Sequence, residues 1–169
     1  MRRLSVAVVA AILALALAGP AVQARTTVMT FSCAEHFADN PEPGRVWVDD
    51  DFVLHVRGSQ WIYEHEGDRY CAGEAHVVVN LNVDLATGEG NLWGTIHVDL
   101  DEIDGGWHRT FSAHFTNPHP LMPDATDIWA GRFVGHGFGE LDGWQIRGQG
   151  IERTHVLVES TGFVFQPGG

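Results

Sequence analysis

Histidine is the first candidate for metal binding or catalysis in this sequence, because ten histidines occur in 169 residues. Imidazole nitrogens bind transition metals, and sequence motifs for metal sites show close spacings such as HExxH. No HxH, HxxH or HExxH spacing occurs here. Strands of a sheet lie about 5 Å apart, so neighbouring strands could still bring together His76, His97 and His108 or His114. All four fall on polar strand faces, where solvated histidines are usual, and we predict no metal site.

Arg109 is the most unusual charged residue in the pattern. It lies two residues after Trp107 on the apolar face of a predicted strand, so we expect its guanidinium to point into the core. Arg147 lies at an odd position, like the glycines before it, and is expected to point inward as well. A buried guanidinium needs a partner. One interpretation is a structural ion pair; the other is an anchor for a carboxylate or phosphate ligand, walled by Trp61, Tyr63 and Trp107.

Other catalytic patterns fail. The chain contains no lysine, which excludes Schiff-base chemistry and a P-loop lysine. There is no GxSxG nucleophile elbow, and the glycine-rich stretch is not the GxGxxG of a dinucleotide site. Acidic pairs such as Glu64 with Glu66 would suit a glycosidase, but turn and edge positions explain them. The catalytic residues therefore stay unknown, and no cofactor is predicted.

Residues 1–24 have the pattern of a secretory signal peptide. Two arginines give a positive start, an apolar run follows, and Val22-Gln23-Ala24 fits a small-x-small cleavage site. The apolar run is shorter than the roughly 20 residues that a spanning helix needs. We therefore expect a secreted or periplasmic protein in which residues 25–169 form a single β-barrel domain.

Two cysteines, Cys33 and Cys71, lie in that domain. In an oxidising compartment a disulfide between them is expected. In the chain-entropy model, closing a loop of this length stabilises the fold by about 4 kcal/mol. A reactive thiol is the alternative, and without a CxxC motif a structural zinc site is not indicated.

The charge balance limits the partners. Without Arg2 and Arg3 the chain has 8 basic and 22 acidic residues, a net charge of −14. So acidic a protein can release few counterions from phosphate, and we expect neither nucleic acid nor, after signal cleavage, a membrane as a partner. A small-molecule ligand and self-association remain.

Short segments of alternating apolar and polar residues recur along the domain. The clearest is 74–85, and the first strand is expected at 26–33. Prolines predict a turn at 39–44 and a loop at 117–127, and residues 58–59 are expected to break a strand. No window keeps a helical period for more than about two turns. The chain is therefore predicted to be all-β, an antiparallel β-barrel of about eight strands, with a sandwich as the alternative.

The densest glycine stretch lies within residues 129–151. Its odd positions include Gly131, Gly135, Gly137, Gly139 and Gly143, which share one face of an extended chain. Glycine weakens a strand, so glycines on one face indicate a close backbone approach or a tight bend at a barrel corner.

The segment Gly131-Arg132-Phe133-Val134-Gly135-His136-Gly137 resembles the glycine–aromatic–glycine signature of the allene oxide cyclase and dirigent barrels. The alternating strands extend this resemblance over residues 52–151. It implies an eight-stranded antiparallel barrel with an internal cavity, and the chain is also similar to small exported bacterial barrels. Calycin-type barrels are the nearest competitor. No catalytic residue of the plant enzymes aligns with this sequence, so the resemblance implies no activity.

The leading hypothesis is a non-catalytic binding module that holds a small apolar or amphipathic ligand in the barrel cavity. One alternative is an enzyme of cyclase or isomerase type, in which a preformed cavity orients a reactive substrate. The other is an interaction protein that assembles with itself.

Overall fold

A computed structural model describes residues 25–115, 129–154 and 157–168. The predicted signal peptide and the predicted loop at 117–127 lie outside these ranges. The described residues form strands and no helix, so they contain no helix that could cross a membrane. The strands are β1 (Thr27–Glu42), β2 (Arg45–Val48), β3 (Val53–Gly67), β4 (Gly73–Asp84), β5 (Gly90–Leu100), β6 (Gly105–Phe115), β7 (Trp129–Gly139), β8 (Gln145–Thr154) and β9 (Leu157–Gln166).

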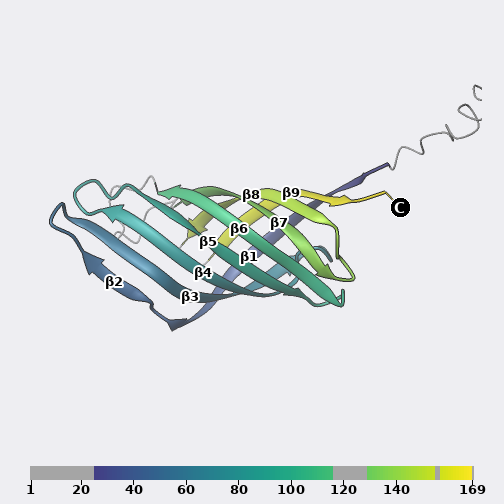
Figure 1. The fold of residues 1–169 in the computed structure, drawn as a ribbon, viewed down its shortest axis with the longest axis horizontal. Coiled ribbons are helices and arrows are strands. Elements are labelled where there is room, and N and C mark those ends of the chain that lie inside the picture. The colour runs from purple at the N-terminus through teal and green to yellow at the C-terminus, as the bar shows by residue number, and fades with distance from the viewer. Residues whose placement is uncertain (1–24, 116–128, 155–156, 169) are drawn as a thin grey trace, which may run out of the picture.

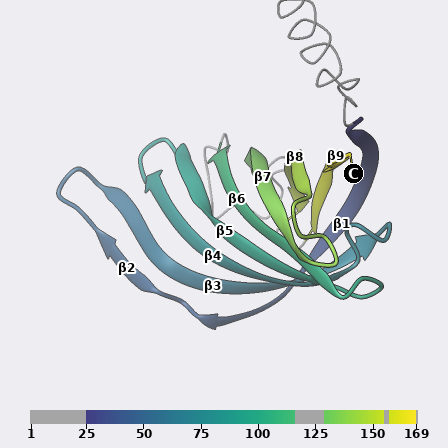
Figure 2. The ribbon, with the colours of Figure 1, turned by 45° about the vertical axis from the view of Figure 1, so that its right-hand side comes forward.

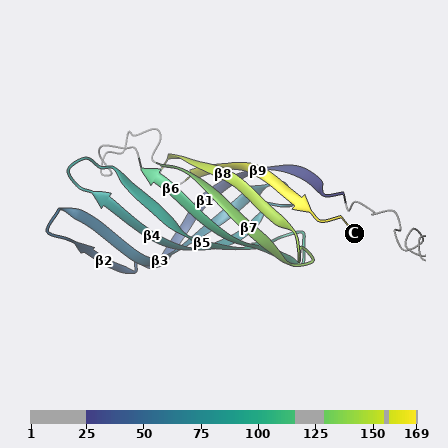
Figure 3. The same cartoon turned by 45° about the horizontal axis from the view of Figure 1, so that its top comes forward.

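The strands form a closed antiparallel barrel (Figure 1). From β3 to β9 each strand pairs with the next one along the chain. Strand β1 closes the ring, because it pairs with both β9 and β3. Figure 2 shows the sheet curving round to the seam where β1 meets β3. Figure 3 shows β2 beside β3, as a strand additional to the closed ring. The prediction of an all-β antiparallel barrel of about eight strands is confirmed, with β2 as one extra strand.

Two strands are longer than the sequence pattern predicted. Strand β1 runs to Glu42, so both the predicted end at residue 33 and the predicted turn at 39–44 are wrong. The second half of β1 stays extended because it pairs with β3, and irregular register after Phe37 accommodates the polar end. The predicted break at 58–59 is a β-bulge inside β3, where Gly58 has a φ of 68°.

The barrel interior is filled by side chains that alternate inward along the barrel strands, whereas the extra strand β2 has no buried residue. Phe133 is buried, whereas its neighbours Arg132 and Val134 are exposed, so Gly131, Gly135 and Gly137 face the interior. Gly139 at the end of β7 and Gly143 in the next turn have positive φ, so the prediction that all five glycines share one face is wrong for these two. A Cβ atom at Gly135 would lie 2.4 Å from the carbonyl oxygen of His108 on β6. The predicted close approach of the backbone is therefore confirmed, and it lets the inward side chains of β6 occupy the space in front of β7.

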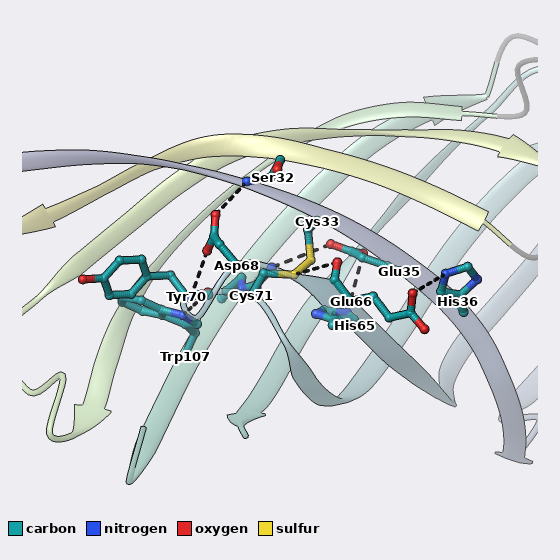
Figure 4. The surroundings of a disulfide bond; sticks show 11 residues. Ser32, Cys33, Glu35, His36, His65, Glu66, Asp68, Tyr70, Cys71 and Trp107 are labelled. Atoms are coloured by element: carbon teal, nitrogen blue, oxygen red, sulfur yellow. Dashed lines mark hydrogen bonds and ion pairs between the residues drawn. A yellow bond between two sulfur atoms is a disulfide. The ribbon is translucent and has the colours of Figure 1, made fainter. Parts of the chain in front are cut away.

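A disulfide fastens the seam of the barrel. Cys33 of β1 is bonded to Cys71 in the turn between β3 and β4, with their Cα atoms 5.7 Å apart (Figure 4). Beside it, the Ser32 backbone N–H donates to the Asp68 carboxylate at 3.1 Å. The predicted disulfide is confirmed, and it is typical of a protein in a non-cytoplasmic, oxidising environment.

Candidate functional site

A buried charged cluster lies next to the disulfide inside the barrel. Glu35 of β1 and His65 of β3 are register partners across the seam, and Arg109 comes from β6. The Glu35 carboxylate lies 3.8 Å from Nε2 of His65 and 3.9 Å from Nη1 of Arg109. Figure 4 shows Glu35 and His65 beside the disulfide. One carboxylate therefore faces both an imidazole and a guanidinium where little solvent reaches.

Burial sets the protonation of this cluster. Loss of solvent lowers the pKa of His65 to about 4, against an opposing effect of Glu35. The imidazole is therefore neutral at neutral pH. Burial also lowers the pKa of Arg109, again opposed by Glu35, but a guanidinium starts so high that it stays charged. At neutral pH we therefore describe the cluster as a Glu35–Arg109 ion pair beside a neutral imidazole.

The ion pair is not closed by short hydrogen bonds. Among the described residues, none accepts a hydrogen bond from the three guanidinium nitrogens of Arg109, and none forms a hydrogen bond with either ring nitrogen of His65. The Phe133 ring lies under the guanidinium, 5.1 Å from ring centroid to Cζ, and supplies a cation–π contact. A buried ion pair held at 3.9 Å recovers only part of its desolvation cost.

A small cavity adjoins the cluster. Its walls are mainly apolar and aromatic, and include Trp61, Tyr63, Phe111 and Phe133, with Glu35 as the buried charged group. The space open to the centres of water molecules is about 40 Å³. At roughly 10–15 Å³ per water, this is room for about three water molecules. The cavity is therefore far smaller than the roughly 300–1,000 Å³ of a drug-sized ligand site.

The cavity has two buried hydroxyl groups besides the carboxylate. Tyr63 and Ser160 line it, and both are buried. Burial, followed by the negative charges of Glu152 and Glu35, raises the pKa of Tyr63. The phenol therefore keeps its proton, and its hydroxyl can donate or accept a hydrogen bond.

The structure places the predicted ligand-binding residues in three different surroundings. Arg109 points inward as predicted, but Glu35 and not Arg109 lines the cavity; Trp61 and Tyr63 line it as predicted walls. Trp107 is fully buried, but it lies outside the cavity lining and its indole N–H donates to the Tyr70 carbonyl at 2.9 Å. Its predicted place in the cavity wall is wrong.

The predicted orientation of Arg147 is also wrong. Its side chain is exposed on the outer face of β8, and its guanidinium lies 4.6 Å from the centroid of the Phe165 ring. The inward positions of β8 are even-numbered, as buried Ile146 shows. Arg147 therefore cannot anchor a ligand in the cavity.

Glu35 and His65 were not identified from the sequence as members of a buried site, although the spacing of each indicated an inward-facing position. Glu35 lies two residues after Cys33, and His65 lies two residues after Tyr63. In a strand this spacing puts each on the same face as its buried neighbour. The third member, Arg109, was found by the same rule.

The disulfide does not provide a second site. The two cysteine sulfurs and an His65 ring nitrogen lie within 4.8 Å of one another. Both sulfurs are joined in the disulfide, so neither is the thiolate that a metal ion binds. In the oxidised protein this group is structural.

Comparison with family models, with curated proteins and with solved structures gives no match for this chain. The resemblance to the allene oxide cyclase and dirigent barrels therefore stays a prediction.

Proposed function

We propose that this protein is a non-catalytic, exported binding module that holds the hydroxyl end of a small amphipathic ligand in its barrel. The observation that carries the proposal is the cavity whose apolar walls meet one buried carboxylate, Glu35, with Arg109 on its other side. Such a combination of apolar walls and one oriented polar group is typical of ligand sites. The signal pattern of residues 1–24 and the disulfide support export.

The charge of the cluster favours a neutral hydrogen-bond donor as the ligand's polar end. The Glu35–Arg109 pair has no net charge, so a hydroxyl group adds a donor for the carboxylate and no buried charge. A carboxylate ligand would meet Glu35 first, and like charges brought together in a buried site cost several kcal/mol. An ammonium group would leave the cluster with an unpaired positive charge. The structure therefore shifts the proposed anchor from Arg109 to Glu35.

The cavity volume limits what can be enclosed. About 40 Å³ open to water centres suits the end of a slender chain, whose remainder would have to extend out of the enclosed part. The aromatic walls formed by Trp61 and Phe111 would cover the apolar atoms nearest the hydroxyl group.

An enzyme of cyclase or isomerase type is the second candidate. It is favoured by the His65 imidazole, which lies 3.8 Å from the Glu35 carboxylate, because imidazole and carboxylate groups are side chains that commonly transfer protons in catalysis. Turnover of a bound unsaturated alcohol, lost in His65→Leu while alcohol binding persists, would distinguish an enzyme from a binding module.

Self-assembly is the third candidate function. It is supported by the exposed Val134 and Phe163 on the outer face of the barrel, and sedimentation velocity at micromolar concentration tests it.

The binding proposal is tested with 1-hexanol and hexanoate, which share an alkyl chain and differ at the polar end. Isothermal titration of the oxidised protein at pH 7.5 should show hexanol binding at one site per chain, with hexanoate weaker by about tenfold or more. Hexanoate binding more tightly than hexanol, or binding of neither, would contradict the proposal.

The variant Glu35→Gln reverses the expected order, because it leaves the Arg109 cation without its carboxylate. Hexanoate should then bind more tightly than hexanol, provided that circular dichroism shows the variant folded. Glu66→Gln is the matched control, since the Glu66 side chain is 78% exposed and faces an exposed histidine, His36, at 3.8 Å. This control should bind both ligands as the original protein does.

A further inference from the structure

Four histidines form a continuous row on the outer wall of the barrel, away from the cavity. His76, His97, His108 and His136 come from β4, β5, β6 and β7, and each is the direct register partner of the next. We call this row the histidine ladder. His114, which the sequence allowed as a member, is paired instead with Asn91 on β5.

The two central rings of the ladder are in direct contact. Nδ1 of His97 lies 3.1 Å from Nδ1 of His108, and their ring centroids are 4.7 Å apart. Two nitrogens each 2.0–2.1 Å from a tetrahedral zinc ion lie about 3.3 Å apart. The observed separation is therefore close to that of two imidazole ligands on one metal ion.

Carboxylates lie behind two of the rings. Nε2 of His97 is 3.3 Å from an Asp99 oxygen, and Nε2 of His76 is 2.9 Å from a Glu74 oxygen. A carboxylate on one ring nitrogen holds the proton there and leaves the other nitrogen with a free lone pair. Metal-binding histidines usually have this arrangement, which also raises the basicity of the ligand. In His97, the nitrogen left free is the one that faces His108.

Packing holds the central pair in place. The Phe138 ring stacks on His97 at 4.9 Å with an interplanar angle of 13°, and it lies 4.8 Å from His108. The His136 ring is 5.5 Å from that of His108 on the other side. All four ladder residues line one shallow depression in the outer wall, so an ion from solvent can reach them.

We propose that the histidine ladder binds one divalent transition-metal ion, with His97 and His108 as the central ligands and His136 as the third. The exposed His136 side chain reaches the ion by rotating about its side-chain torsions, and solvent completes the coordination. Imidazole ligands suit zinc, copper and nickel ions, whereas calcium and magnesium prefer oxygen. The net charge of −12 for the whole chain further favours a cation.

Zinc chloride titrated into metal-free protein at pH 7.5 tests the proposal by calorimetry and native mass spectrometry. We expect one zinc ion per chain, with affinity reduced by about tenfold or more in His97→Gln, in His108→Gln and in His136→Gln. Asp99→Asn should lower the affinity by about 10- to 100-fold, the usual effect of losing the carboxylate behind a metal-binding imidazole. His114→Gln, an exposed histidine on the same strand as His108, should leave zinc binding unchanged.

Three results would overturn the proposal. One is the absence of zinc binding at micromolar concentration; another is binding that His97→Gln and His108→Gln leave unchanged. The third is half an ion per chain in a dimer, which would mean that the ion lies between two copies. His97, His108 and His136 all lie on the outer wall, so their replacement should leave the core intact. Thermal unfolding at the original temperature will show that these variants remain folded.

Discussion

Arg109 and Glu35 show, at the scale of single residues, how one buried charge depends on another. Replacing Arg109 with Met leaves Glu35 buried without a cation, and the free energy of unfolding should fall by about 3–5 kcal/mol. Adding Glu35→Gln removes the stranded charge, so the double variant should recover most of that loss. Urea unfolding of the four proteins in this cycle measures the coupling. Losses that simply add would contradict a direct interaction between the two side chains.

His65 predicts a dependence of stability on acidity. Burial lowers its pKa from 6.5 to about 4 in the folded protein, so between these values the unfolded chain binds a proton that the folded chain does not. Stability from this group is complete above pH 6.5 and is lost as pH falls towards 4. The loss is about 3 kcal/mol. His65→Leu should flatten the unfolding free energy over this range, whereas His114→Gln, at an exposed position, should keep the original slope.

At the scale of elements, the glycines of β7 decide how closely β6 and β7 fit together. A methyl group at Gly135 would meet the backbone of His108 and, at 3.0 Å, the Cγ atom of Arg109. Gly135→Ala should therefore lower the unfolding free energy by about 1–3 kcal/mol. The neighbouring Val134 is 58% exposed, and Val134→Ala should change it by about 0.5 kcal/mol at most. Equal effects of the two substitutions in thermal unfolding would argue against this close fit.

The disulfide fastens the element that closes the barrel. It joins residues 38 positions apart, and on the chain-entropy model its loss should reduce stability by about 4 kcal/mol. The double variant Cys33→Ala/Cys71→Ala and the reduced original protein should lose similar amounts in urea unfolding. Adding reductant to the double variant should change nothing, which checks that the effect comes from this bond.

Within one strand, odd or even position in the sequence correctly predicted which side chains point into the barrel. The same rule failed when it was carried from one strand to the next. It correctly placed Arg109, Trp61 and Tyr63 inside. It failed for Arg147 because the turn between β7 and β8, with Gly139 at a φ of 66° and Gly143 at 81°, resets the alternation. Inward positions are odd-numbered in β7 and even-numbered in β8. When the geometry of a turn is unknown, the sequence therefore does not predict which side chains of the next strand point inward.

At the scale of the whole molecule, the sequence predicted the class of fold but not how the barrel closes. Each hairpin pairs residues placed symmetrically about a turn, so the pairing of His76 with His97 follows from the turn between β4 and β5. The pairing of Glu35 with His65 follows from no turn, because it depends on closure of the barrel by β1. The cavity is lined by all the strands that close the barrel, and Glu35 meets His65 across that seam, which is why the sequence identified only some of their residues.

The central claim is that the cavity beside Glu35 holds the hydroxyl end of a small amphipathic ligand, and native mass spectrometry tests it most directly. The oxidised protein is measured alone and after addition of 1-hexanol, and then both samples are measured again under denaturing conditions. The account predicts one organic ligand per chain in the hexanol sample, released on denaturation and lost in Glu35→Gln. A native mass equal to that of the chain less two hydrogens, in both samples, would contradict it.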